Sequence, residues 1–292
     1  MIPAVNFHLW EPCNMRCQFC SATFQDVKIS ILPKGHLPKE QAIEIVSKLS
    51  EAGFKKITFA GGEPTLCSWL SELILKAKQA GLTTMIVSNG SKLTDDFLKA
   101  NQRNLDWITL SIDSLNDETN LTTGRAVSGK KAMNKETYLE LVDKIKAYGY
   151  GLKINTVVTA KNYDENIIDF IEYAKPIRWK IFQVLPIVGQ NDQKIDPLKI
   201  SKAQFQFFID SHQLASLITQ IVPETNDQMK GSYVMVDPAG RFFDNTTGKH
   251  LYSEPILKVG FQKAFNQMDY SAFKFKDRGG YYDWESPVFK AS

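Results

Sequence analysis

The sequence predicts an α/β protein in which helices cover both faces of a parallel sheet. Apolar, β-branched segments alternate with segments whose apolar residues recur at helical spacing. Roughly six such strand–helix units follow one another between Ala4 and Leu185, which is typical of a parallel sheet. Strands this apolar need cover on both faces, as in a doubly wound sheet or in a complete or partial barrel.

Each element of this alternation has its own signal. Ala4–Leu9 is a short apolar run that leads directly into a cysteine-rich loop, and Gly53 ends the first long helix. The later strands are expected at 56–59, 83–87, 107–112, 152–158 and 178–185. The helices are expected where apolar residues share one face, around 42–49, 70–77, 138–145 and 165–174.

The last part of the chain loses this rhythm. Residues 202–217 predict one more helix, whereas Asp237–Gly240 and Asp244–Gly248 are turn sequences. The glycine- and aromatic-rich stretch Asp277–Trp284 has no periodicity and is expected to cap the site or to order as a lid over it. We therefore expect a core over residues 1–190 and an irregular α+β extension over 191–292, within one structural domain.

Composition and charge exclude several classes of protein. The 292 residues are 43% hydrophobic and 23% charged, which is ordinary for a globular chain and excludes wholesale disorder. The net charge of +3 is too small to indicate nucleic-acid binding. The sequence has neither an apolar stretch long enough to span a membrane nor a visible signal peptide, so we expect a cytoplasmic protein without a membrane partner.

Three of the four cysteines lie together, and they are the most informative residues of the chain. Cys13, Cys17 and Cys20 form a C-x3-C-x2-C pattern, which places three thiols on one tight loop. Three thiolates can hold three irons of a cubane cluster and leave the fourth iron open to a ligand. A structural zinc site is the alternative, but it needs four protein ligands, and no partner motif is present. Cys67 stands alone and is expected to pack without a role.

This cysteine pattern, with Phe19 before the last cysteine, resembles that of the radical S-adenosylmethionine (SAM) superfamily. Gly61-Gly62-Glu63-Pro64 follows the second strand, where the superfamily carries its loop for the SAM amino group. Two further strand ends carry the residues that correspond to its positions for the SAM ribose and carboxylate: Ser88, Asn89 and Ser111. The resemblance implies a partial (βα)6 radical SAM barrel, a 4Fe–4S cluster held by the three cysteines, and SAM as cofactor.

Nearly the whole chain resembles one family of that superfamily, viperin and its prokaryotic relatives. The matching segments are 5–8, 152–155, 176–183, 222–226, 229–233 and 278–280, with basic loops at 124–125 and 129–131. The resemblance places Arg125 near the SAM carboxylate. It implies dehydration of a ribonucleoside triphosphate (CTP, UTP or GTP) to its 3′-deoxy-3′,4′-didehydro analogue, a chain terminator in antiviral defence. The N-terminal amphipathic helix of animal viperins is missing, so we expect no membrane association.

Four cations on predicted strands are consistent with a triphosphate substrate. They are Lys56, Lys153, Arg178 and Lys180, and strand alternation puts the last two on one face. A barrel interior that holds four cations needs an anion of similar charge, and a triphosphate supplies it. The alternative is that these side chains lie at strand edges and point to solvent.

Three further residues are candidates for contact with the substrate. Asn6 and His8 alternate on the first strand beside the cluster, so both can face a ligand, although a buried core histidine is the commoner case. Tyr233 matches a family tyrosine proposed to help complete the reaction and is the candidate proton or hydrogen donor. The alternative for Tyr233 is a packed core tyrosine on an apolar strand.

Two other functions stay open. One is radical SAM chemistry on another substrate, such as a purine cyclisation or a peptide modification, although no cysteines for auxiliary clusters are present. The other is a non-catalytic, cluster-bearing protein that binds a partner. Catalysis requires an electron donor, and a nucleotide kinase is a further possible partner.

Overall fold

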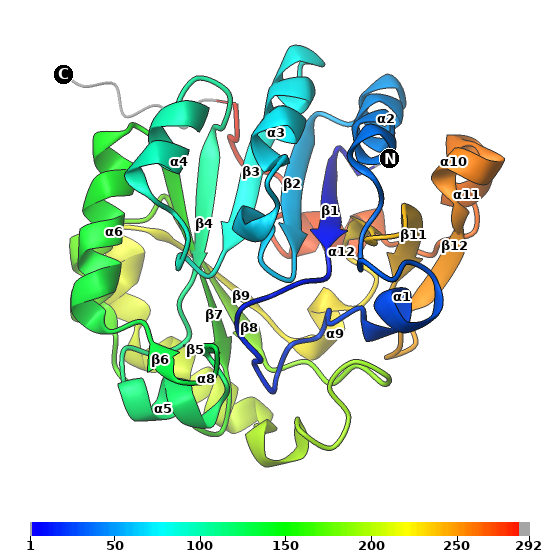
Figure 1. The fold of residues 1–292 in the computed structure, drawn as a ribbon. Helices are drawn as coiled ribbons and strands as arrows, with labels where there is room; N and C mark the ends of the chain where they lie inside the picture. The colour runs from blue at the N-terminus through cyan, green and yellow to red at the C-terminus, as the bar shows by residue number, and fades with distance from the viewer. Residues whose placement is uncertain (1, 286–292) are drawn as a thin grey trace.

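The computed structural model describes residues 2–285. A ten-stranded sheet dominates the fold (Figure 1), with the strand order β12-β11-β10-β1-β2-β3-β4-β7-β8-β9. The strands are β1 (Ala4–Trp10), β2 (Lys56–Gly61), β3 (Thr83–Ser88), β4 (Trp107–Ser111), β7 (Gly151–Val158), β8 (Arg178–Gln183), β9 (Gln220–Glu224), β10 (Val234–Val236), β11 (Arg241–Asp244) and β12 (Leu251–Pro255). A separate hairpin pairs β5 (Ala126–Val127) with β6 (Lys131–Ala132).

The sheet is parallel over most of its width. The six predicted strands form it as expected, in the order β1-β2-β3-β4-β7-β8. Two further strands extend it: β9, which the sequence did not predict, pairs parallel with β8, and β10, the apolar strand considered at Tyr233, pairs parallel with β1. At one edge of the described sheet, β11 pairs antiparallel with both β10 and β12. The C-terminal extension is therefore partly regular, because it lengthens the sheet at both ends.

The sheet curves into an open barrel. Strands β9 and β10 lie at opposite ends of the parallel part, and no strand pairing joins them in the described chain. Their side chains nevertheless meet, because Tyr233 beside β10 donates a hydrogen bond to Glu224 of β9 over 2.5 Å. The parallel strands thus enclose an interior without closing the hydrogen-bonded ring, and they form a partial barrel in which β10 and β9 flank the six predicted strands.

Helices cover the outer face of this barrel (Figure 1). The predicted helical faces are buried against it, as in α2 and α6, whose apolar residues are those that the periodicity selected. The helices are α1 (Gln25–Ser30), α2 (Lys39–Glu51), α3 (Leu70–Gln79), α4 (Asp95–Asn101), α5 (Asp117–Thr122), α6 (Lys135–Ala147), α7 (Ile168–Ala174), α8 (Lys202–Ser211), α9 (Asn226–Met229), α10 (Ile256–Val259), α11 (Phe261–Phe265) and α12 (Ala272–Asp277).

Two predicted helices differ from the structure. The helix expected over 165–174 begins at Ile168, and the one expected over 202–217 breaks at His212 into α8 and a 3₁₀ turn. The buried ring of His212 explains the break, because it contacts the Phe208 carbonyl over 2.7 Å and accepts a hydrogen bond from Ile167 N over 3.0 Å. Among the residues described, no helix is both long and apolar enough to cross a membrane.

Candidate active site

The three clustered cysteines lie on the loop that follows β1. Cys13, Cys17 and Cys20 line one cavity of about 320 Å³ at the carboxyl ends of the parallel strands. Burial raises the pKa of Cys13 to about 11 and that of Cys20 to about 12. Thiols in this environment therefore need a strong positive charge nearby to ionise. In the part of the chain that the structure describes, no three potential ligands converge on a single metal ion.

The glycine loop after β2 packs directly on the cysteine loop. Gly62 N donates to the Trp10 carbonyl, and Glu63 N donates to the Pro12 carbonyl over 2.9 Å. A Cβ at Gly62 would lie 2.2 Å from the carbonyl oxygen of Glu11, so only glycine fits this approach. Gly61 and Gly62 line the cysteine cavity, as expected from the sequence.

Glu63 also lines this cavity, but its carboxylate is fully engaged within the protein. It accepts hydrogen bonds from the Thr65 hydroxyl (2.6 Å), the Ser88 hydroxyl (2.8 Å) and Asn89 N (2.7 Å). Burial raises its pKa, and these donors oppose the shift. Glu63 thereby ties the loop after β2 to the loop after β3. Ser88 and Asn89 line the same cavity beside it.

Arg125 lies next to the cysteines and orders the end of β4. Its guanidinium pairs with Asp113 at 3.0 Å, donates to the Ser111 carbonyl, and lies 3.7 Å from Cys17 Sγ. All four residues line the cysteine cavity. Sequence analysis missed Asp113, although a carboxylate just after a strand at the carboxyl edge of a parallel sheet was an available signal.

A second cavity, of about 330 Å³, continues from the first into the barrel interior. The residues that line both cavities are His8, Phe19, Ser21, Ala60, Val87, Asn155, Val157 and Phe182. The predicted residue Asn6 lines the inner cavity. Burial, followed by the neighbouring His250, lowers the pKa of His8 to about 3, so this ring is neutral at physiological pH. Cys67 packs in the hydrophobic core and lines neither cavity.

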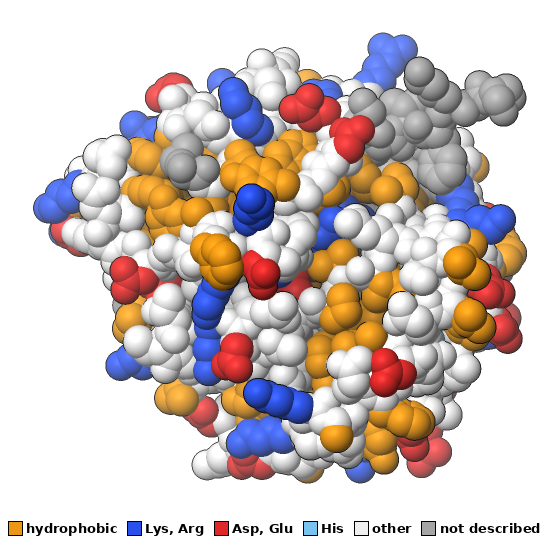
Figure 2. All heavy atoms as spheres, turned by 180° about the vertical axis from the view of Figure 1, so that it is seen from behind, with side chains coloured by type: hydrophobic (Ala, Val, Ile, Leu, Met, Phe, Trp, Pro, Cys, Tyr) orange, Lys and Arg blue, Asp and Glu red, His pale blue; other side chains and the backbone are white. Residues whose placement is uncertain are grey.

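The inner cavity is strongly cationic. Lys56, Lys153, Arg178 and Lys180 all line it, so they point inward rather than to solvent. Arg278 joins them from the chain that follows α12. Burial and then their mutual repulsion lower the pKa of Lys56 and of Lys153 well below the ordinary value. On the outer face that Figure 2 shows, by contrast, side chains of both signs are interspersed.

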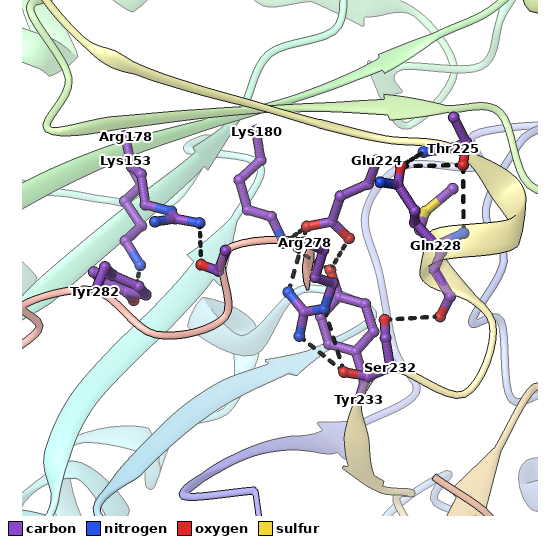
Figure 3. Close-up of polar contacts among 12 residues, drawn as sticks. Lys153, Arg178, Lys180, Glu224, Thr225, Gln228, Ser232, Tyr233, Arg278 and Tyr282 are labelled. Carbon is purple, nitrogen blue, oxygen red and sulfur yellow. Dashed lines mark hydrogen bonds and ion pairs between the residues drawn. The ribbon is translucent and has the colours of Figure 1, made fainter. Parts of the chain in front are cut away.

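A tyrosine from the C-terminal segment sits among these cations. The Tyr282 hydroxyl accepts hydrogen bonds from Lys153 and, over 3.0 Å, from Lys56. Its ring centroid lies 3.8 Å from Lys153 Nζ and 4.4 Å from the Arg178 guanidinium carbon (Figure 3). The aromatic tail that sequence analysis expected to cap the site thus reaches the cationic end of the cavity.

One carboxylate lies within this cationic group. Glu224 of β9 is fully buried and pairs with Lys180 at 2.5 Å and with Arg278 at 3.4 Å. Tyr233 donates to it over 2.5 Å and accepts a hydrogen bond from Lys180 over 2.6 Å (Figure 3). Glu224 and Arg278 lie in segments that resemble the family, but neither residue was predicted as part of the site. For Glu224 the only signal was its charge, in a short strand that was not predicted, and Arg278 lies just after α12.

The fold and these two cavities define a radical SAM protein, and the comparisons agree. The Radical SAM superfamily matches residues 10–174. Among solved structures, anSMEcpe with bound AdoMet has a TM-score of 0.70 at 13% identity, covering 90% of this chain and 80% of that one. SuiB of Streptococcus suis bound to S-adenosylmethionine has a TM-score of 0.63 at 15% identity, covering 82% and 59%. At these identities the likeness concerns the fold alone.

Sequence relatives narrow this class to one family. A protein named S-adenosylmethionine-dependent nucleotide dehydratase from Flammeovirga pacifica is 58% identical, with 98% of this chain and 97% of the relative covered. One of the same name from Lacinutrix mariniflava is 61% identical, but the chain spans only 59% of its length. The S-adenosylmethionine-dependent nucleotide dehydratase RSAD2 of Danio rerio is 35% identical, covering 98% of this chain and 79% of the relative. The chain belongs to this nucleotide dehydratase family, the viperins.

Membership in this family implies a 4Fe–4S cluster and SAM, and the residues present fit both. Three thiols line one cavity, and no fourth cysteine does. A cluster held this way keeps one iron open for a small ligand. The glycine loop, Ser88, Asn89 and Arg125 surround the same space with backbone groups, polar groups and one cation. These are suitable partners for the amino group, hydroxyls and carboxylate of SAM.

Proposed function

We propose that this protein dehydrates a ribonucleoside triphosphate, with CTP, UTP or GTP as the substrate, to the 3′-deoxy-3′,4′-didehydro nucleotide. The observation that carries the proposal is the pairing of the two cavities. A polyanion in the inner cavity would lie directly beside the cysteine cavity, because eight residues line both. The names of the relatives support a nucleotide substrate.

The charge inside the inner cavity supports a triphosphate rather than a neutral substrate. Five cationic side chains line it, and within the described chain Glu224 is the carboxylate that pairs with two of them. Buried charges are stable only when they are paired and hydrogen-bonded. A triphosphate would supply several negative charges and many acceptor oxygens, whereas a peptide backbone would supply none of that charge.

In this proposal the two cavities have separate roles. Cys13, Cys17 and Cys20 would hold the cluster, which together with bound SAM would supply the radical chemistry that removes the hydrogen atom at the sugar 4′ position. The cations hold the triphosphate at the amino ends of β2, β7 and β8, which leaves the sugar near the junction of the two cavities. Phe19, Val157 and Phe182 at this junction are apolar and exclude water from the radical.

The 3′ hydroxyl leaves as water, which requires a proton, and a second electron completes the reaction. Lys180 and Tyr233 both line the inner cavity and both carry a proton on a polar atom. A low-potential electron donor is therefore a required partner. We propose antiviral defence through chain-terminating nucleotides as the biological role, supported by the family resemblance.

The reaction itself tests this function. The reconstituted holoenzyme is incubated anaerobically with SAM, a strong reductant and one of CTP, UTP, GTP or ATP, with the Cys17→Ala variant as the control. We expect 5′-deoxyadenosine together with a nucleotide lighter by one water for at least one triphosphate, and neither product from the variant. SAM cleavage without any nucleotide product would refute the substrate assignment.

A further inference from the structure

Glu224 lies behind the wall of the inner cavity rather than in it. It lines neither cavity, and its side chain is fully buried. One carboxylate oxygen contacts Lys180 and Arg278, and the other accepts the hydrogen bond of Tyr233. The Arg278 guanidinium also stacks on the Tyr233 ring at 3.7 Å. Three residues of the cavity wall are thus fixed by a fourth that a substrate cannot touch.

The hydrogen bonds among Glu224, Lys180 and Tyr233 determine which of the two donors keeps a free N–H or O–H for a substrate. A lysine ammonium only donates, and an ionised carboxylate only accepts. Tyr233 therefore accepts a hydrogen bond from Lys180 and donates its single O–H to Glu224. Lys180 uses one N–H on Glu224 and one on Tyr233, so its third N–H remains for the cavity that it lines. In this arrangement Lys180, and not Tyr233, keeps a free N–H for a group in the cavity.

We propose that Glu224 is a positioning residue for the dehydration, which holds Lys180 as the proton donor and turns the Tyr233 hydroxyl away from the sugar. The proposal rests on the proposed function and assigns the proton of that reaction. As the sugar C3′–O bond breaks, the Lys180 N–H bond breaks and its proton joins the departing oxygen, which leaves as water. One electron from the low-potential donor then reduces the oxidised sugar to the closed-shell alkene, and solvent reprotonates the neutral lysine.

The electrostatics of Lys180 suit an acid at neutral pH. Burial lowers its pKa to about 7, and Glu224 opposes that shift. The titratable and charged groups that face it from the surrounding elements are Lys56, Lys153, Arg178, Glu224, Tyr233 and Arg278. All except Glu224 and Tyr233 are cations, so Glu224 is the group that keeps Lys180 protonated before a nucleotide binds. By contrast, burial raises the pKa of Tyr233 well above its ordinary value of 10.0, which makes it a poor acid.

The pH dependence of the Glu224→Gln variant tests the proposal. Glutamine keeps the size of the side chain but removes the charge, so the pKa of Lys180 falls further. Activity that depends on protonated Lys180 then disappears at a lower pH than in the wild type. We expect the alkaline limb of kcat/KM for dehydration, which reports the nucleotide-free enzyme, to move down by about one pH unit or more, which is about a tenfold loss of kcat/KM at pH 8 with recovery at lower pH. An unchanged limb would overturn the proposal.

Two variants separate Lys180 from Tyr233. Lys180→Arg keeps a positive charge for the triphosphate, but arginine does not give up its proton. We expect nucleotide binding within about threefold of the wild type, continued 5′-deoxyadenosine formation, and at least about a hundredfold less dehydrated nucleotide, a loss typical of removing a general acid. Tyr233→Phe should retain at least about a tenth of the dehydration rate. If Tyr233→Phe instead makes 5′-deoxyadenosine and no dehydrated nucleotide, Tyr233 is the donor and the proposal fails.

A matched control distinguishes a loss of positioning from a loss of stability. Asp237 is another buried carboxylate, paired with Arg241 at 2.6 Å, and it lines neither cavity. Asp237→Asn should lower Tm without moving the pH profile. A shift of the profile in this variant as large as in Glu224→Gln would contradict the assignment. The wild-type enzyme, run in parallel, reports on the proposed function separately, because without its dehydrated product the function itself fails.

Discussion

Replacing one buried lysine of the inner cavity should stabilise the nucleotide-free protein and weaken its binding of triphosphate. Lys153 is 4% exposed, and its ammonium lies among like charges with the Tyr282 hydroxyl as its oxygen partner. Methionine has a similar length and no charge. Lys153→Met therefore removes a repulsive charge from the empty cavity and a favourable one from the occupied cavity.

The structure sets the size of both effects. Lys56 and Lys153 donate to the same hydroxyl, so their ammonium nitrogens lie within about 6 Å, where two unit charges at an effective dielectric of about 20 repel by about 3 kcal/mol. We expect Lys153→Met to raise the free energy of unfolding by about 1–3 kcal/mol without nucleotide. A charged hydrogen bond contributes about 1.5–3 kcal/mol, so triphosphate affinity should fall about 10- to 150-fold.

The stabilisation should also depend on pH in a defined direction. The pKa of Lys153 is depressed in the folded state, so the unfolded chain binds more protons and wild-type stability rises with pH toward 10.5. The stability curves of wild type and Lys153→Met should therefore converge as the pH approaches that value. Chemical unfolding with and without CTP, UTP or GTP measures both effects, together with calorimetric titration.

A surface lysine provides the control for this prediction. Lys144 is exposed, pairs with Asp95 at 2.7 Å and lines neither cavity. Lys144→Met should change stability by less than about 0.5 kcal/mol and leave affinity unchanged. A Lys153→Met protein that is less stable than the wild type, or that binds triphosphate equally well, would refute the electrostatic reasoning.

Three further outcomes follow from the same structure. Gly62→Ala should abolish cluster retention and SAM cleavage, because its Cβ would lie 2.2 Å from the carbonyl oxygen of Glu11. Iron content and absorbance measure cluster retention, and a normal cluster would contradict the close approach of the two loops. Cys17→Ala should lose the cluster and all 5′-deoxyadenosine formation, whereas a variant that still cleaves SAM would contradict its role as a ligand. Tyr282→Phe should lower the free energy of unfolding by about 1–3 kcal/mol without nucleotide, and by less with saturating triphosphate, as measured by thermal unfolding. An equal loss in both states would contradict the overlap of this hydroxyl with the phosphate site.

The sequence predicted those parts of the fold that depend on local patterns. Six strands and the main helical faces follow from apolar periodicity, because each buries one side against the same core. It missed β9, which is short and contains a proline and a buried glutamate. The places of β9 and β10 in the sheet depend on how the chain curves around the barrel interior, which local periodicity does not encode.

The candidate site divides in the same way. Lys56, Lys153 and the pair Arg178 and Lys180 were predicted from cations on strands, and all four line the inner cavity. Glu224 and Tyr282 escaped prediction, because their partners lie on other elements and meet them only in the folded chain. A buried carboxylate beside five cations can be expected on electrostatic grounds, but the sequence spacing does not identify Glu224 as that carboxylate.

Transfer of a deuterium label from the sugar of the nucleotide to 5′-deoxyadenosine tests the central claim most directly. The holoenzyme is given SAM, reductant and the preferred triphosphate carrying deuterium at the 4′ position, and the 5′-deoxyadenosine is analysed by mass spectrometry. If the nucleotide lies in the inner cavity with its sugar at the junction, the 5′-deoxyadenosine gains one deuterium and the dehydrated nucleotide contains none at 4′. Unlabelled 5′-deoxyadenosine, or deuterium retained in the dehydrated nucleotide, would contradict the account.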